Sequence, residues 1–125
     1  MIFGIGTDII EINRIRQAVE HKNFKERVYT ENERDYCQNR GKQAAASFAA
    51  RFAGKEAFFK ALGTGIFTDL TDVEILNDSA GKPEIFLHGK ALEFFRRSNL
   101  DKIFLSLSHS KDYATAVCVL KRKES

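Results

Sequence analysis

Residues 43–62 constrain the fold most, because this stretch contains no proline and only one internal glycine, Gly54. Alanine, phenylalanine and lysine fill most of its positions, and alanine and lysine favour a helical backbone. The stretch therefore predicts the longest helix of the chain. Gly63 and Gly65 follow directly, and glycine commonly ends a helix by adopting a left-handed backbone.

One face of this predicted helix carries phenylalanine. At 100° per residue, Phe48, Phe52 and Phe59 fall within one stripe, and Glu56 lies about 60° from its centre. A carboxylate so close to an apolar face needs an explanation. The ordinary one is an ion pair with Lys60, one turn further along a solvated helix.

The remaining segments follow from hydrophobic periodicity and turn chemistry. Thr30 and Glu33 form a capping box, which marks a helix start. Because helices and strands segregate rather than alternate, we predict an α+β fold with a mostly antiparallel sheet packed against the long helix. The predicted elements are a strand at 2–6, helices from about 9 and over 31–39, a hairpin over 73–88, a helix at 89–99, strands at 102–108 and 113–120, and a charged tail at 121–125.

The composition indicates a single cytoplasmic domain over residues 1–125. There is one proline and no linker or repeat, and the apolar runs are far shorter than the roughly 18 residues that span a membrane. Cys37 and Cys118 lie far apart and outside any Cys-x-x-Cys motif, so we expect reduced thiols. The net charge of +3 suits an acidic partner or a phosphate without establishing either.

Two carboxylates are candidate metal ligands. Asp8 follows the first predicted strand, where the ordinary interpretation is a helix N-cap. Alternatively, the Asp8 and Glu56 carboxylates could bind the same Mg²⁺ ion. Mg²⁺ takes one or two protein carboxylates and completes its shell with water and substrate phosphates. Both interpretations remain open from the residues alone.

Several basic residues are candidates for phosphate binding. Arg51, Lys55 and Lys60 lie on or beside the long helix, where they either stabilise phosphate charge or form an ordinary basic surface. His109 follows a predicted strand among serines, which suits a ligand contact and equally an exposed turn. The dinucleotide and P-loop signatures are absent from the sequence.

A basic cluster lies on and after the first predicted helix. It is either a solvated face or a docking surface for an acidic partner. No nucleic-acid motif or aromatic platform accompanies it, so a small acidic protein fits at least as well as a nucleic acid. Its members are Arg14, Arg16, His21, Lys22, Lys25 and Arg27.

Four segments together resemble one known family. Residues 3–15, with Asp8, are similar to the opening motif of holo-[acyl-carrier-protein] synthases, and residues 51–66, with Glu56, resemble their central motif. Residues 81–83 and 107–114 are similar to the third and fourth motifs. The segments follow the order of the family and cover essentially the whole chain, so the resemblance implies a 4'-phosphopantetheinyl transferase fold.

The resemblance also implies an activity in fatty acid biosynthesis. The 4'-phosphopantetheine group of coenzyme A would pass to a serine of apo acyl carrier protein, leaving adenosine 3',5'-bisphosphate. Asp8 and Glu56 would bind Mg²⁺, and Lys60 would contact the coenzyme A diphosphate. The general base stays open between these carboxylates and an activated water. Coenzyme A would also be held by Arg51, Gly63 and His109, and the carrier protein by Arg14, Lys22 and Lys25.

Members of this family assemble as homotrimers with coenzyme A between protomers, which the resemblance implies here too. Two competing functions remain. A small basic module could bind an acidic protein or nucleic acid without catalysis, in which case Asp8 and Glu56 would be structural. A Mg²⁺-dependent phosphohydrolase could use the same carboxylates to activate water. No membrane partner is expected.

Overall fold

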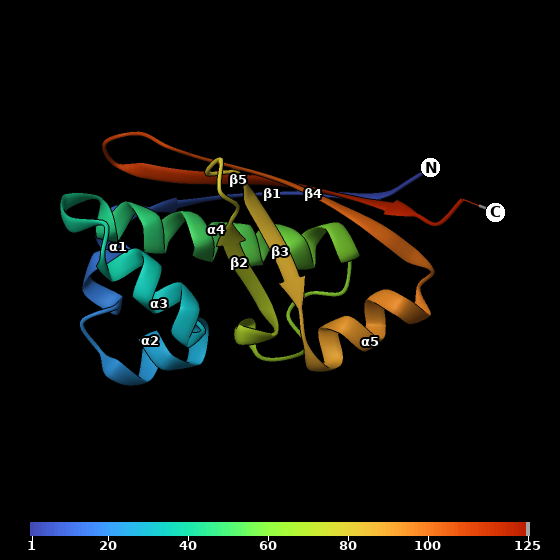
Figure 1. Ribbon diagram of the computed structural model, residues 1–125, viewed down its shortest axis with the longest axis horizontal. Coiled ribbons are helices and arrows are strands. Elements are labelled where there is room, and N and C mark those ends of the chain that lie inside the picture. Colours follow the sequence, from blue (N-terminus) through green and yellow to red (C-terminus); the bar gives the residue numbers. More distant parts are fainter. Residues whose placement is uncertain (125) are drawn as a thin grey trace.

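A three-stranded antiparallel sheet packs against one long helix in the computed structural model, which describes residues 1–124 (Figure 1). Its strands lie in the order β1 (Ile2–Glu11), β5 (Tyr113–Arg122) and β4 (Leu100–His109), and the helix is α4 (Ala44–Leu62). A separate hairpin of β2 (Val73–Asn77) and β3 (Pro83–Leu87) crosses α4 in the view of Figure 1, and β3 also lies beside β4 of that sheet. The predicted α+β class is confirmed.

The shorter helices cover the rest of α4. The capping box is present. The Thr30 hydroxyl accepts a hydrogen bond from the backbone amide of Glu33, and the Glu33 carboxylate accepts one from the backbone amide of Thr30. Gly63 ends α4 in a left-handed conformation at φ 80°, as predicted. The remaining elements are α1 (Ile12–Ala18), α2 (Lys22–Val28), α3 (Glu31–Gln38), α5 (Gly89–Arg97) and two short 3-10 helices, η1 (Gly41–Gln43) and η2 (Leu70–Asp72).

The predicted helix start near residue 9 is wrong. Strand β1 continues to Glu11, because its backbone pairs with β5 as far as Tyr113, and α1 begins only at Ile12. Helix α2 was missed, since it is short and only Phe24 and Val28 mark its apolar side. The predicted frayed tail is also wrong for Lys121 and Arg122, which belong to β5, whereas residue 125 lies outside the described part of the chain.

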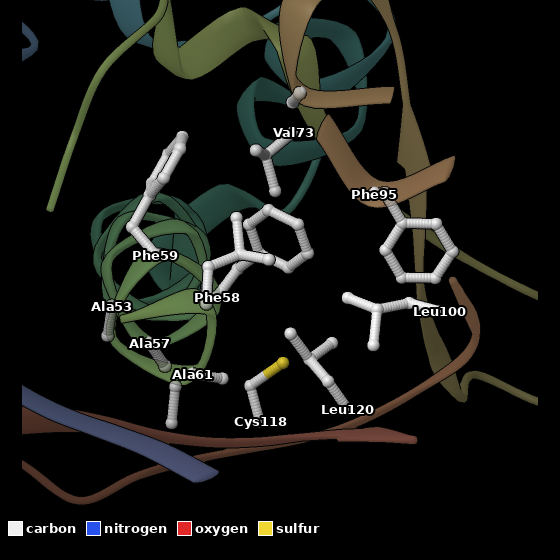
Figure 2. Packing of buried hydrophobic residues seen from close by; sticks show 13 residues of the cluster. Ala53, Ala57, Phe58, Phe59, Ala61, Val73, Phe95, Leu100, Cys118 and Leu120 are labelled. Carbon is white, nitrogen blue, oxygen red and sulfur yellow. The ribbon is translucent and has the colours of Figure 1, made fainter. Parts of the chain in front are cut away.

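Helix α4 is buried on nearly every side, not along a single phenylalanine stripe. Among its residues only Lys60 is exposed. Figure 2 shows Ala57 and Ala61 facing Cys118 of β5, while Phe58 points toward Val73 and Leu120.

Within residues 1–124, no helix is long and apolar enough to cross a bilayer.

Two glycines let β1 lie directly against α4. A side-chain carbon at Gly6 would overlap the carbonyl oxygen of Ala57, and one at Gly4 would overlap that of Ala61. Both neighbours are backbone atoms, which cannot rotate away. Because Gly4 lies against Ala61 and Gly6 against Ala57, the strand runs back along the helix from its end, and Asp8 comes within reach of the Lys60 side chain.

We expect Gly6→Ala to lower the free energy of unfolding by about 2 to 3 kcal/mol, because overpacking against a backbone has no side chain to relax. Thermal or urea unfolding would measure the loss. Gly54→Ala is the matched control. Its added carbon would meet the Cδ1 atom of Ile75 at 2.6 Å, and that flexible methyl can shift. An equal or smaller loss in Gly6→Ala would contradict the close-packing argument.

Candidate active site

Four of the predicted site residues, the three catalytic candidates and Arg14, line one open cavity of about 550 Å³ between β1, α1 and α4. Asp8 comes from β1, and Glu56 and Lys60 come from successive turns of α4. Side chains alternate along a strand, so Asp8 shares the α4-facing side of β1 with the two glycines that let the strand approach the helix. The structure thus brings together residues 48 positions apart in sequence.

Lys60 contacts Asp8 directly. Its ammonium group lies 3.0 Å from the Asp8 Oδ1 atom and donates to the carbonyl oxygen of Thr7, also at 3.0 Å. The Asp8 side chain is 15% exposed and that of Lys60 is 55% exposed, so the pair sits at the mouth of the cavity. The N-cap interpretation of Asp8 is wrong, because Asp8 lies inside a strand. The ordinary explanation of Glu56 also fails, because Lys60 pairs with Asp8 instead.

The Glu56 carboxylate is electrostatically strained. Partial burial raises the pKa of Glu56, the nearby charge of Asp8 raises it further, and Lys60 offsets part of the effect. In residues 1–124 no hydrogen bond to this carboxylate is formed. Two carboxylates that disfavour each other's charge are stabilised by a cation placed between them.

The donor set fits magnesium better than a metal that needs a full protein cage. The described chain contains no group of three or more His, Cys, Asp or Glu side chains that could hold a metal ion. Two carboxylates that line an open cavity would leave the other coordination positions to water and a substrate phosphate, which is the usual arrangement for Mg²⁺. Asp8 and Glu56 therefore suit a metal that arrives with a phosphorylated substrate.

Arg51 and His109 line a different cavity, of about 160 Å³. The Arg51 guanidinium donates to Ser47 at 3.2 Å and to the side chain of Asn77, and it stacks over the ring of Tyr36 at 4.4 Å. Its Nε atom is buried and has no partner among the described residues. Gly81 and Pro83, from the third motif, line the same cavity.

The two cavities lie on different sides of α4. Arg51 and Lys60 are nine residues apart, which corresponds to about 900°, or opposite faces, and to about 13 Å along the axis. Gly63 lines neither of these two cavities and serves as the C-cap of α4. A single chain therefore does not bring all the predicted site residues together.

The predicted carrier-binding residues lie around the first cavity. Arg14 lines it directly, from α1. Lys22 and Lys25 do not line it, but they belong to α2, whose Phe24 does. The cluster thus continues from the cavity onto the neighbouring helix.

Sequence reasoning missed the apolar wall of the first cavity. Phe24, Phe52 and Tyr113 form part of it. Phe52 could have been found, since it lies one turn before Glu56 on α4. Phe24 belongs to a helix that was not predicted, and Tyr113 is placed by the pairing of β5 with β1.

Lys55 was interpreted either as a phosphate contact or as part of an ordinary basic helix surface, and its burial in the structure excludes both. Its side chain is fully buried and its ammonium group lies 2.8 Å from the Glu33 Oε1 atom. It also donates to the carbonyl oxygens of Leu70 at 2.9 Å and Val73 at 2.7 Å, so all three protons have an acceptor. The other Glu33 oxygen accepts the Ile75 amide at 2.8 Å. Lys55 is therefore a structural link between α3, α4 and β2.

Comparisons with known proteins find relatives over nearly the whole chain. The model of the family described as ACPS, 4'-phosphopantetheinyl transferase superfamily, matches residues 4–118. The chain is 47% identical to the holo-[acyl-carrier-protein] synthase of Geobacter metallireducens, covering 98% of this chain and 99% of that one. It is 51% identical to the synthase of Alkaliphilus metalliredigens, covering 95% and 98%.

Solved structures give the same result for the fold. The holo-(acyl-carrier-protein) synthase of Bacillus anthracis, in complex with CoA (3',5'-ADP), superposes with a TM-score of 0.82 at 40% identity, covering 98% of this chain and 99% of that one. The synthase of Neisseria meningitidis superposes with a TM-score of 0.89 at 33% identity, covering 98% and 100%.

Proposed function

The chain belongs to the 4'-phosphopantetheinyl transferase superfamily, and from this premise we propose that it transfers 4'-phosphopantetheine from coenzyme A to a serine of apo acyl carrier protein. The products are the holo carrier protein and adenosine 3',5'-bisphosphate. The observation that carries the proposal is that Asp8, Glu56 and Lys60 line one cavity in a chain this similar to named synthases. We also propose that the enzyme works in the cytoplasm as a single domain over residues 1–125.

Asp8 and Glu56 would hold Mg²⁺, which would supply charge stabilisation for a phosphoryl group in transfer. Lys60, on its flexible stem at the cavity mouth, would contact the coenzyme A diphosphate and offset the charge that develops on it. The carrier serine oxygen forms a bond to the β-phosphorus while the bond to the bisphosphate oxygen breaks. The serine proton passes to a base, for which we favour a water held beside the two carboxylates.

We propose that the complete site forms between two copies of the chain. Arg51 and His109 would hold the nucleotide end of coenzyme A, yet they face a different cavity from Glu56. The face of the sheet away from α4 exposes apolar side chains, which supports assembly through this face. A homotrimer would seat the nucleotide half of one protomer beside the metal half of the next. The exposed apolar residues include Ile5, Ile9, Phe104 and Val117.

The basic cluster is the proposed docking surface for the carrier. Arg14 at the cavity rim, with Lys22 and Lys25 on α2, would attract an acidic carrier helix and bring its serine to the cavity. The cluster lies beside the metal half of the site, so docking and chemistry would occur on the same protomer face.

Intact-mass spectrometry tests the activity. Apo acyl carrier protein is incubated with this protein, coenzyme A and Mg²⁺, with a chelated sample as the control. We expect the carrier to gain the mass of one phosphopantetheine, and the chelator to prevent the gain. Bisphosphate release without a carrier would favour a phosphohydrolase. If none of several carrier proteins gained mass, the hypothesis of a binding module without catalysis would be favoured.

Mixing two inactive variants tests the shared site. We expect Glu56→Gln and Arg51→Met each to be poorly active, and a mixture reassembled from dissociated protomers to regain activity. In a closed ring, about a quarter of the sites would combine two unaltered halves. The transfer rate of the mixture against each variant alone measures this. A mixture no more active than its components would place the whole site in one chain.

A further inference from the structure

Lys60 places a positive charge directly beside the Asp8 carboxylate. Its ammonium group lies 3.0 Å from the Asp8 Oδ1 atom, and its second hydrogen bond goes to the Thr7 carbonyl oxygen of the same strand. Apart from these two oxygens, the described chain offers no partner to this side chain. A lysine that is 55% exposed is thus bent onto a carboxylate that is only 15% exposed.

A divalent cation and this ammonium group would both be bound by the single negative charge of the Asp8 carboxylate, whose Oδ1 atom Lys60 already contacts. Two positive charges on one carboxylate repel each other, because they lie only a few ångströms apart. A metal bound to Asp8 therefore weakens the contact between Lys60 and Asp8, and the contact in turn weakens metal binding. The four-carbon stem of Lys60 allows the ammonium group to move away, and an ion pair at a solvent-exposed position is weak enough to break.

We propose that Lys60 is a built-in counter-ion that keeps the carboxylate site from binding metal until a diphosphate arrives. This inference rests on the proposed function, because the diphosphate of coenzyme A gives the displaced ammonium group its new partner. Without that partner, metal binding weakens the contact between Lys60 and Asp8, and the ammonium group gains no other partner in exchange. With it, the ammonium group exchanges a carboxylate for a phosphate.

The consequence is reciprocal coupling between metal and coenzyme A. If the diphosphate releases Asp8 from Lys60, metal affinity rises when coenzyme A is bound, and coenzyme A affinity rises by the same factor when metal is bound. Removing the ammonium group eliminates the competition. The affinity of the free protein for metal then increases while its affinity for coenzyme A decreases, so the two ligands respond in opposite directions to one substitution.

The test is calorimetric titration of Mn²⁺ into the full chain without coenzyme A. We expect Lys60→Met to bind Mn²⁺ about tenfold more tightly than the unaltered protein, the effect of removing one adjacent charge. Lys60→Arg retains the charge and is expected to keep the weaker affinity. Lys90→Met is the matched control, because Lys90 is an exposed lysine on α5, and its loss changes the net charge equally.

The possible outcomes separate this inference from the proposed function. Mn²⁺ binding that Asp8→Asn abolishes, but that is equal in Lys60→Met and the unaltered protein, overturns the counter-ion role alone. Weaker binding in Lys60→Met, or no binding in either protein, also overturns it. The proposed transfer activity is judged independently by the carrier mass. Equal tightening in Lys90→Met would reduce the effect to net charge and overturn the specific role of Lys60.

Discussion

Glu56→Gln is expected to slow phosphopantetheine transfer at least about 100-fold, because an uncharged amide replaces one of two carboxylates that would hold Mg²⁺. The shape of the side chain is preserved, so the cavity and α4 should be unchanged. The rate of carrier mass gain at saturating coenzyme A measures the loss. Glu93→Gln is the matched control, since Glu93 is exposed on α5, away from the cavity.

The same variant should not lose stability when metal is absent. Burial and the charge of Asp8 raise the pKa of Glu56, so the folded protein holds this proton more tightly than the unfolded chain. Stability therefore falls as pH rises from the ordinary pKa of a glutamate through the raised one. Glu56→Gln removes that decline, and its melting temperature at about pH 7 in chelator should equal or exceed that of the unaltered protein. A large drop would make Glu56 structural, and unaltered transfer would exclude it from the metal site.

Lys55→Met is expected to lower the free energy of unfolding by about 3 to 5 kcal/mol, the usual cost of leaving one partner of a buried ion pair uncompensated. Methionine fills nearly the same volume, so the loss comes from charge and hydrogen bonding. The carbonyl oxygens of Leu70 and Val73 lose the hydrogen bonds that the Lys55 ammonium group donates, and Glu33 keeps a buried charge. Urea unfolding followed by circular dichroism would measure the effect.

Two controls define the origin of that loss. Lys90→Met removes an exposed lysine and should change stability by less than about 0.5 kcal/mol. The double variant Lys55→Met/Glu33→Gln removes both charges and should be more stable than the sum of the two single losses predicts. Strictly additive losses would mean that the two side chains do not act as a pair.

Local signals predicted much of this fold. The capping box at Thr30, the uninterrupted helix over 44–62 and the hairpin around the 77–82 turn each depend on residues close in sequence. The predicted strand ended too early, because Ile9 and Ile10 fit the start of a helix as well as the end of a strand. Pairing with β5, more than 100 residues away, decides between the two.

The candidate site divides in the same way. Asp8, Glu56 and Lys60 were selected from the sequence, and the structure brings them to one cavity. The burial of Lys55 could not be predicted from the sequence. A lysine one position before Glu56 is expected at the surface unless its buried partner, Glu33, is known. Nor did the sequence separate Arg51 from the metal half, since that depends on what covers each side of α4.

Helix α4 has no spare surface, and this bears on how the protein tolerates mutation. Lys60 is the one exposed position on the helix, and it is the position that pairs with Asp8. Elsewhere in a protein, exposed helical positions absorb random substitutions at little cost. On α4, Lys60 is free of packing constraints, but its ion pair with Asp8 restricts which residues can replace it. Neutral drift must therefore accumulate in segments such as the exposed side of α5, and α4 should change more slowly than any other helix of the chain.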